Sequence, residues 1–383
     1  MSAGVPAKWH CPLASGNVVR FLDEAGHPMA GNPGFSFQDL WDFYLESHFV
    51  YASKKAGIIP YLDQIFDTWN RLFCSGGDVA RIVLRLKKGR VRNAMTMLRM
   101  YPRTWVVQHM ASLADPKGMM LVLLDAIGWM MQNETLDFGR FYWQPQNRPA
   151  EKMFAGLNQS LQEKGIADKN MRSYHYHIIP LKLVDQRFPP AEQGFTYRPV
   201  EPSEFGDISG LLREDWGPID FQAQALEAGH LDLAGLNDLY HPHGLHRSRL
   251  LLVAEKGGKP AGVAGLEFSN LGMNFSYCFN RFELYYLAPH VSTERRNGIL
   301  SGLVRAGADY YAQRGRDFMV LFCDVEGFSL ETMGLAPDRH YKCLSLSRQS
   351  GNSATMEHFM SFYRDRMAEM PAISKWRAGA NFG

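Results

Sequence analysis

The stretch of sequence that decides the fold is ELYYLAPHVSTERRNGILSGLVRAGADYY, residues 283–311. Its apolar and aromatic start predicts a strand over 281–289, and the amphipathic run that follows predicts a helix over 296–315. Between them lie two arginines and Gly298. A glycine at the start of a helix lets an anion approach free backbone N–H groups, and arginine adds charge-assisted hydrogen bonds. The stretch therefore predicts a strand, a phosphate-binding loop and a helix.

The residues on either side of this stretch predict a regular order of elements. Alternating apolar residues and turn residues predict strands over 195–200, 317–325 and 340–347, and a hairpin over 248–268 around Gly257 and Gly258. Helical spacing predicts helices over 202–215, 221–240, 328–334 and 354–369. The second half of the chain is therefore expected to combine a mixed sheet with helices, an α+β arrangement.

The first half of the chain repeats this order. The predicted elements are helices over 37–55 and 59–73, a strand pair over 80–100, a strand over 104–110, a helix over 115–133, a strand over 137–145, a helix over 148–161 and a strand over 173–181. Gly118 precedes Asp137 by 19 residues, and Gly298 precedes Asp317 by the same 19. A fixed spacing combined with a shared order of elements indicates a duplicated unit. The two prolines and the polar residues of 183–194 predict the linker between the copies.

Composition limits the classes of function. The 41 basic and 39 acidic residues leave a net charge of +2, which provides no electrostatic footprint for a nucleic-acid partner. Five cysteines without a C-x-x-C motif predict a reducing compartment, and no apolar run has the length of a membrane span. We therefore expect a cytoplasmic protein without a membrane partner. The histidines at 241–246 and 175–177 fall in a predicted loop and a predicted strand, so no metal site is expected.

In its order of elements, the second half resembles the GNAT acyltransferases over 195–349. The family's cofactor loop follows the pattern Arg/Gln-x-x-Gly-x-Gly/Ala, and Arg295, Gly298 and Leu300 fall on its three defined positions. The whole chain resembles a tandem GNAT protein, which implies an α+β fold of two GNAT-like domains, each a mixed, mostly antiparallel sheet flanked by helices. The implied parts are a degenerate GNAT-like domain at 1–182, a linker at 183–194, a GNAT domain at 195–350 and a helical extension at 351–383.

The resemblance implies an acyl-CoA co-substrate, with acetyl-CoA as the default donor. Its pantetheine arm would enter between the strands at 281–289 and 317–325, and its diphosphate would lie at the start of the helix. Leu300 is larger than the glycine or alanine that the family pattern has at this position. Because it is rotated roughly 200° around the helix from Gly298, we expect its side chain to turn toward the sheet. The implied cofactor-binding residues are Tyr286, Leu287, Ala288, Arg295, Arg296, Asn297, Gly298, Ile299, Leu300 and Ser301.

The corresponding loop of the first half has lost the residues that suit an anion. It reads ADPKGMM over 114–120, so Asp115 stands where the pattern has arginine or glutamine, and Met120 fills the last small position. An acidic side chain there would repel a diphosphate. We therefore expect the first copy to have a structural or substrate-covering role.

Acyl transfer to an amine needs a base for the amine proton and a polarised thioester carbonyl. By the resemblance Glu283 is the candidate base, while the alternative of an exposed strand glutamate paired with Arg281 or a neighbouring lysine stays open. Tyr285 is expected on the same face of the strand as Glu283. The position of the tyrosine that commonly protonates the leaving thiolate in the family falls on Leu330, so Tyr341 is a substitute candidate.

The resulting hypothesis is an acyl-CoA-dependent N-acyltransferase whose acceptor is a primary amine of a small molecule or a peptide. The alternative hypothesis is a catalytically silent GNAT-fold protein with a regulatory or ligand-sensing role. Leu300, Leu330 and the degenerate first copy motivate this alternative.

Overall fold

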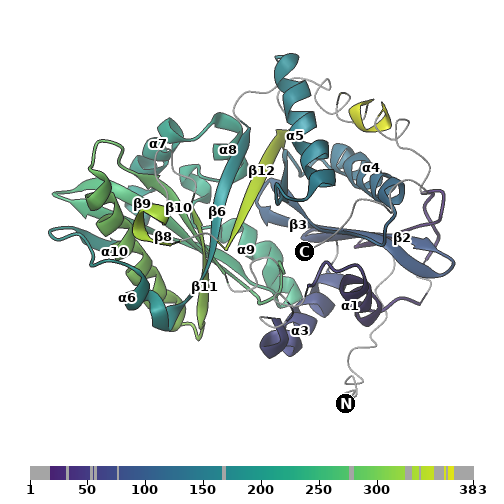
Figure 1. Cartoon of the computed structure of the whole chain (residues 1–383), viewed down its shortest axis with the longest axis horizontal. Coiled ribbons are helices and arrows are strands. Elements are labelled where there is room, and N and C mark those ends of the chain that lie inside the picture. The colour runs from purple at the N-terminus through teal and green to yellow at the C-terminus, as the bar shows by residue number, and fades with distance from the viewer. Residues whose placement is uncertain are drawn as a thin grey trace.

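The computed structural model describes residues 18–348 except 32–33, 52–54, 56–57, 76, 166–169, 276–279, 324–329 and 336–337, together with residues 358 and 361–365. Its centre is one continuous sheet of 12 strands in the order β1-β2-β3-β4-β5-β12-β6-β11-β10-β9-β8-β7 (Figure 1). Only three neighbouring pairs of this sheet are parallel: β1 with β2, β4 with β5 and β10 with β11. The prediction of a mixed, mostly antiparallel sheet flanked by helices is therefore confirmed.

The elements follow the predicted order closely. The strands are β1 (Val19–Leu22), β2 (Ala80–Lys87), β3 (Arg90–Tyr101), β4 (Thr104–Ser112), β5 (Phe138–Trp143), β6 (Met171–Pro180), β7 (Thr196–Pro199), β8 (Arg247–Lys256), β9 (Lys259–Ser269), β10 (Arg281–Leu287), β11 (Phe318–Cys323) and β12 (Arg339–Ser347). The α-helices are α1 (Phe37–Glu46), α3 (Leu62–Phe73), α4 (Pro116–Gln132), α5 (Arg148–Glu163), α6 (Val184–Arg187), α7 (Phe205–Asp215), α8 (Pro218–Ala223), α9 (Ala234–Tyr240) and α10 (Thr293–Ala312).

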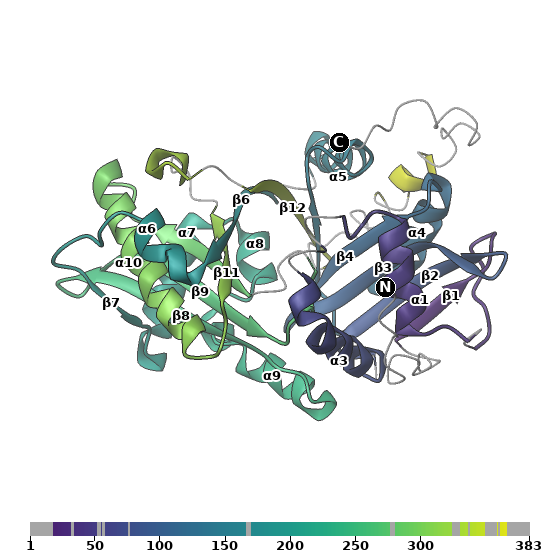
Figure 2. The same cartoon turned by 60° about the horizontal axis from the view of Figure 1, so that its bottom comes forward.

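The two halves of the chain exchange their last strands. β6, the last strand of the first half, pairs with β11 of the second half, and β12 of the second half pairs with β5 of the first. β6 and β12 also pair with each other, so they lie side by side where the halves meet (Figure 2). The sheets predicted for the two halves are therefore joined into one.

The helices divide into two groups that cover opposite faces of the sheet. The hydrophobic core on one face contains side chains of α10 and α6 in the second half and of α4 and α5 in the first half. On the other face lie α1, α3 and α9 over one core, and α7 and α8 over another. Because strand side chains alternate between faces, the residues of β10 and β11 divide between these two environments.

One predicted helix is broken. The sequence predicts a continuous helix over 221–240, but the chain forms α8, a 3₁₀ turn and α9 instead. Ala225 (φ 53°) and Leu233 (φ 61°) adopt left-handed backbone conformations, which a continuous α-helix does not contain. Apolar spacing alone therefore misread two short helices as one.

The predicted C-terminal helix over 354–369 falls largely outside the described residues. Residues 361–365 are helical, and the buried Tyr363 hydroxyl donates a hydrogen bond 3.2 Å long to the Met153 carbonyl on α5. This part of the C-terminal extension therefore packs on the first half of the chain.

Candidate functional site

The parallel strands β10 and β11 pair along the first residues of β10. Their pairing in the described residues extends to Leu284 opposite Cys323, whereas β10 runs on to Leu287. A bulge at Tyr285 interrupts the pairing of β10 with β9 between Leu284 and Tyr286. A bulge adds an unpaired residue and bends its strand. Here the Tyr285 carbonyl accepts a hydrogen bond of 2.9 Å from the Trp216 indole N–H.

The helix after β10 begins earlier than predicted. α10 starts at Thr293 instead of residue 296, so Arg295, Arg296, Asn297 and Gly298 lie within its first two turns. The Arg296 N–H already donates a hydrogen bond of 2.9 Å to the Ser292 carbonyl. Free backbone N–H groups occur only in the first turn of a helix. The predicted loop is therefore helical, and an anion at the N-terminus of α10 meets the N–H groups near Thr293, ahead of Gly298.

The segment that the sequence predicts as a linker covers α10. A Cβ atom at Gly298 would lie 2.9 Å from the Cβ and 3.1 Å from the Cα of Glu192. The Glu192 N–H donates to the Gly298 carbonyl at 3.1 Å, and its carboxylate accepts from Arg295 Nε at 3.1 Å. Tyr197 lies against Gly302, one turn further along the helix. We call residues 184–194 the covering segment.

Arg305 on α10 forms hydrogen bonds with the other end of the covering segment. Its Nε donates to Asp185 Oδ1 at 2.9 Å, and its two terminal nitrogens donate to the carbonyls of Pro189 and Phe188 at 2.6 and 2.9 Å. The Phe188 and Val184 side chains are buried in the core beneath α10. The predicted linker is therefore a packed part of the second half.

These contacts change the interpretation of Arg295 and Gly298. The sequence pattern predicts a phosphate partner for both residues, because arginine and glycine at a helix start suit an anion. In the structure the Glu192 carboxylate contacts Arg295. The backbone of Glu192 lies so close to position 298 that a residue with a Cβ atom would not fit there without a shift. A role in CoA binding stays a prediction for both residues.

The other predicted cofactor residues lie mostly in the core. Ile299, Leu300, Leu287 and Ala288 are buried in the core that α10 shares with the sheet. The expectation that Leu300 turns toward the sheet is confirmed, and burying such a side chain stabilises the fold by roughly 1.5–3 kcal/mol. Among the described residues, the buried Ser301 hydroxyl has no hydrogen-bond partner.

The side chains of three further predicted cofactor residues, Tyr286, Arg296 and Arg295, differ in their exposure to solvent. Tyr286 is half-buried, and its burial raises the pKa of its phenol, as do the acidic Asp215 and Glu214 nearby. Arg296 is 7% exposed, so its guanidinium lies beneath the surface of α10. By contrast, the Arg295 side chain is 60% exposed and available to a ligand.

Glu283 and Tyr285 lie together on the face of the sheet that α7 and α8 cover. Glu283 is fully buried; its Oε1 accepts a hydrogen bond of 3.3 Å from Gln224, and its Oε2 pairs with Arg281 at 3.0 Å. The Tyr285 hydroxyl accepts from Arg249 at 3.2 Å, and burial raises the pKa of Tyr285 to about 12. The alternative of a glutamate paired with Arg281 is therefore right about the pairing, but both side chains are buried instead of exposed.

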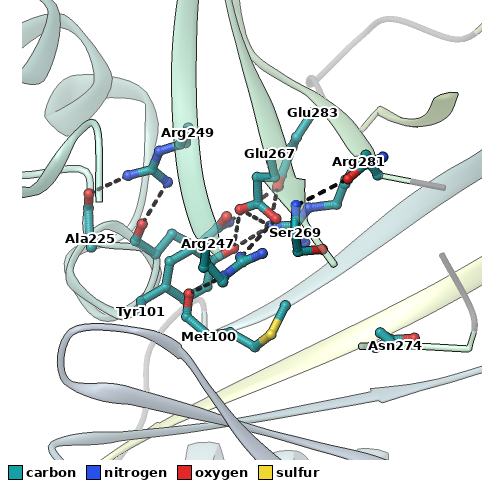
Figure 3. A network of polar contacts seen from close by, with 12 residues as sticks. Met100, Tyr101, Ala225, Arg247, Arg249, Glu267, Ser269, Asn274, Arg281 and Glu283 are labelled. Carbon is teal, nitrogen blue, oxygen red and sulfur yellow. Dashed lines mark hydrogen bonds and ion pairs between the residues drawn. The ribbon is translucent and has the colours of Figure 1, made fainter. Parts of the chain in front are cut away.

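A buried ion network lies next to Glu283, where the halves of the chain meet. Figure 3 shows Glu267 between Arg247 and Arg281, with ion-pair distances of 2.9 and 2.7 Å. Burial alone would raise the pKa of Glu267, but Arg247 and Arg281 lower it well below its ordinary value. Tyr101, which comes from β3 of the first half, donates to Glu267 at 2.9 Å and also contacts Arg281. Glu267 therefore connects both halves.

The remaining catalytic candidates lie apart from Glu283. The Tyr341 hydroxyl accepts a hydrogen bond of 3.1 Å from Gln144 and lies 9% exposed among aromatic side chains. Leu330, which occupies the position of the family's acid tyrosine, starts a short 3₁₀ helix and is fully buried. Of the two candidate tyrosines, Tyr285 is therefore the one whose hydroxyl interacts electrostatically with Glu283.

In the first half, the chain's own side chains occupy the corresponding helix start. Asp115 caps α4 by accepting the Gly118 N–H at 2.9 Å, and Arg85 donates to the same carboxylate at 2.5 Å. A Cβ at Gly118 would lie 2.4 Å from Arg85 Nη1 and 2.3 Å from Asn93 Oδ1. An ion pair between Arg85 and Asp115 therefore fills this helix start, and the loss of anion binding in the first half stays a prediction.

A loop from the second half also fills the first half beside β4. The carbonyls of Gly272 and Met273 accept hydrogen bonds of 2.8 and 3.1 Å from Trp69 and Gln108. Phe275 stacks on His109, a residue of β4 with φ of 52°, at a centroid distance of 4.5 Å. Residues 272–275 of the second half therefore pack into the first half beside His109 of β4.

Searches of the described residues for other kinds of site give two findings. They contain no group of three or more histidine, cysteine or acidic side chains arranged to hold a metal ion. The helices within the described ranges are too short or too polar to cross a membrane.

Comparisons with known proteins give likenesses of fold. No family model matches the sequence, and no curated protein matches it. Similar solved structures include a GCN5-related N-acetyltransferase from Sphaerobacter thermophilus, with 14% identity over 74% of this chain and 85% of that protein and a TM-score of 0.41. A tandem GNAT protein from the clavulanic acid biosynthesis pathway has 11% identity over 75% of this chain and 89% of its own, with a TM-score of 0.39. A functionally unknown conserved protein from Staphylococcus epidermidis has 13% identity over 67% and 91%, with a TM-score of 0.39.

Sequence reasoning missed two features of this region. Glu192 lies in a Pro-rich polar stretch that predicts a linker, and no local pattern there indicates contact with α10. Arg140 is fully buried on β5, and its signal was visible as an arginine inside the apolar run FGRFYW. A charged residue in such a run has to be paired with a partner when it is buried.

Proposed function

We propose that the chain is an acyl-CoA-dependent N-acyltransferase of GNAT type, with acetyl-CoA as the default donor. The observation that carries this proposal is the bulge at Tyr285 of β10, the strand directly before α10. A bulge leaves a residue of its strand unpaired, and backbone groups without a strand partner can bond to an extended ligand arm. The backbone of 286–288 would hold the pantetheine arm, and the start of α10 with Arg295 and Arg296 would hold the diphosphate.

In the proposed reaction, the acceptor is a primary amine of a small molecule or a peptide. Its nitrogen attacks the thioester carbonyl carbon, the C–S bond breaks, and an amide and the CoA thiol form. Glu283 accepts the amine proton, directly or through water, and Tyr285 supplies a proton to the leaving sulfur. Tyr285 suits this role because its pKa of about 12 keeps the hydroxyl protonated at neutral pH.

The proposal requires movement of the covering segment and of the groups around Glu283. Glu192 contacts both Arg295 and Gly298, so an incoming diphosphate would have to replace its carboxylate. Glu283 is fully buried and bonded to Gln224, so an acceptor amine would reach it only after α8 and the residues that follow it shift. Closing and opening of this kind is common around acyl-transfer and phosphate-binding sites.

A second candidate function is favoured by the same contacts. If the covering segment and α8 stay in place, the protein is a silent GNAT-fold module with a regulatory or ligand-sensing role. The contacts of Glu192 with Arg295 and Gly298 favour this candidate, because they use both residues structurally.

An assay of thiol release separates the two candidates. Acetyl-CoA is incubated with the full chain and a panel of amino acids, polyamines, amino sugars and peptides, and free CoA thiol is measured with a chromogenic disulfide. The enzyme candidate predicts release that depends on one amine class and is lost in Glu283→Gln. Glu331→Gln, a change at an exposed carboxylate, is the matched control. CoA binding without release for any amine supports the silent candidate.

A further inference from the structure

The buried polar groups at the junction of the halves carry unequal charge. The side chains concerned are each no more than 3% exposed. They are the arginines Arg140, Arg247, Arg249 and Arg281, and the acids Asp220, Glu267 and Glu283. Four guanidinium groups therefore face three carboxylates. Charges this deeply buried have to be paired or hydrogen-bonded.

Three of the four arginines make close contacts with carboxylates or backbone carbonyls. Arg247 pairs with Glu267 and donates to the Met100 carbonyl at 2.9 Å. Arg281 pairs with Glu267 and with Glu283. The Arg249 guanidinium donates to four backbone carbonyls, those of Gln224, Ala225, His230 and Leu231. The remaining arginine, Arg140, has the weakest contacts of the four.

Arg140 is poorly satisfied despite being fully buried. Its Nη2 donates to the Tyr174 hydroxyl at 3.3 Å and lies 3.9 Å from Asp220 Oδ1. Its Nε and Nη1 have no hydrogen-bond partner within the described part of the chain. Asp220 Oδ1 also accepts a hydrogen bond from Ser345, which competes for the same oxygen. Unmade hydrogen bonds at a buried charged group are costly, so a further partner is required.

The titratable neighbours of Arg140 supply no negative charge at neutral pH. Burial raises the pKa of the Cys343 thiol to about 11, so the thiol stays neutral. Burial also raises the pKa values of Tyr142 and Tyr174 well above the ordinary value, and the Arg140 guanidinium lies over the Tyr142 ring at 5.2 Å. Asp220 is the one carboxylate against this guanidinium in the described residues.

We infer that Arg140 is the centre of a binding site for a small monovalent anion, a carboxylate or a halide, beneath α8. The anion accepts hydrogen bonds from Nε and Nη1 of Arg140, to which the described residues provide no partner. Ser345, which lies opposite Arg140 in the pairing of β12 with β5, and Asp220 on α8 bound the site. The charge of the anion balances the fourth arginine. This site does not depend on acyl transfer.

The first test is diffraction from crystals of the full chain soaked in sodium bromide. The inference predicts an anomalous bromide peak within hydrogen-bonding distance of Arg140 Nε or Nη1. Ordered water at both nitrogens without any bromide would overturn the inference, because water then satisfies the guanidinium without a balancing charge.

The second test measures binding in solution. Thermal unfolding is followed in gluconate buffer at constant ionic strength as acetate, formate or chloride replaces gluconate. The unfolding temperature of the wild type should rise saturably with at least one of these small anions. Arg140→Met should abolish this rise, whereas Arg148→Gln, which alters an exposed arginine on α5, should leave it unchanged. Which anion acts best distinguishes a carboxylate ligand from a halide.

Asp220→Asn keeps the inference testable if Arg140→Met fails to fold. Removing Asp220 takes away the one carboxylate that the described residues place near Arg140, so anion affinity should rise roughly tenfold, as expected for a hydrogen-bonded charge. Equal responses to anions in the wild type and Asp220→Asn would contradict the inference.

Discussion

Replacing Glu192 by alanine should strengthen CoA binding. The Glu192 carboxylate lies 3.1 Å from Arg295 Nε, where the proposed diphosphate would bind. In the wild type, CoA has to displace this ion pair before Arg295 can contact a phosphate. In Glu192→Ala, Arg295 is free from the start, so the cost of breaking the pair disappears from the binding free energy.

The exposure of the pair sets the size of the effect. The Arg295 side chain is 60% exposed and that of Glu192 is 24% exposed, so water screens most of their attraction. Exposed pairs of this kind contribute about 0.2–1 kcal/mol, which corresponds to an increase in affinity of about 1.4- to 5-fold. The gain should shrink at high salt, because salt screens the pair that the wild type has to break.

Isothermal titration of CoA into wild type, Glu192→Ala and Glu192→Asp at two salt concentrations measures this effect. Glu192→Asp keeps the charge and is the matched control, so its affinity should stay nearer to that of the wild type. An affinity for CoA that is equal in all three proteins would refute the argument that Glu192 occupies the diphosphate position.

Three further predictions concern stability. Gly298→Ala places a Cβ against Glu192; the strain of about 1–3 kcal/mol should exceed the helix-propensity gain of about 1 kcal/mol, so the urea midpoint should fall. Tyr101→Phe removes the hydroxyl that contacts Glu267 and Arg281 and should cost about 1–3 kcal/mol in urea unfolding; an unchanged midpoint would show that the halves do not depend on this contact. The pKa of Glu267 is lowered in the folded state, so its contribution to stability is complete above the ordinary value of 4.5 and is lost as the pH falls below it. Unfolding midpoints measured from pH 7 to pH 3 should therefore decline below about pH 4.5, and a flat profile would contradict this assignment.

Local sequence patterns predicted the elements well where the signal is local. The hairpin of β8 and β9 turns at Gly257 and Gly258, both with positive φ, as the glycine pair indicated. The spacing of 19 residues from Gly118 to Asp137 and from Gly298 to Asp317 has a structural counterpart, because β5 and β11 each begin one residue after that aspartate. β1 has only four residues, which is too short for a periodic pattern to show.

Contacts between distant segments were not predictable in this way. The exchange of β6 and β12 between the halves depends on pairing across more than a hundred residues, and alternation within a strand does not specify its partner. For the same reason the sequence predicted that Leu300 is buried but gave no sign that Glu192 covers Gly298. Burial follows from position on a helix, whereas the covering contact depends on the path of the whole chain.

The central claim, that the second half binds acyl-CoA at the start of α10, is tested most directly by calorimetric titration of the full chain with CoA. The account predicts saturable binding by the wild type and weaker binding by the Arg295→Ala/Arg296→Ala double variant, with unchanged circular dichroism. Absence of binding at millimolar CoA by both the wild type and Glu192→Ala would contradict it.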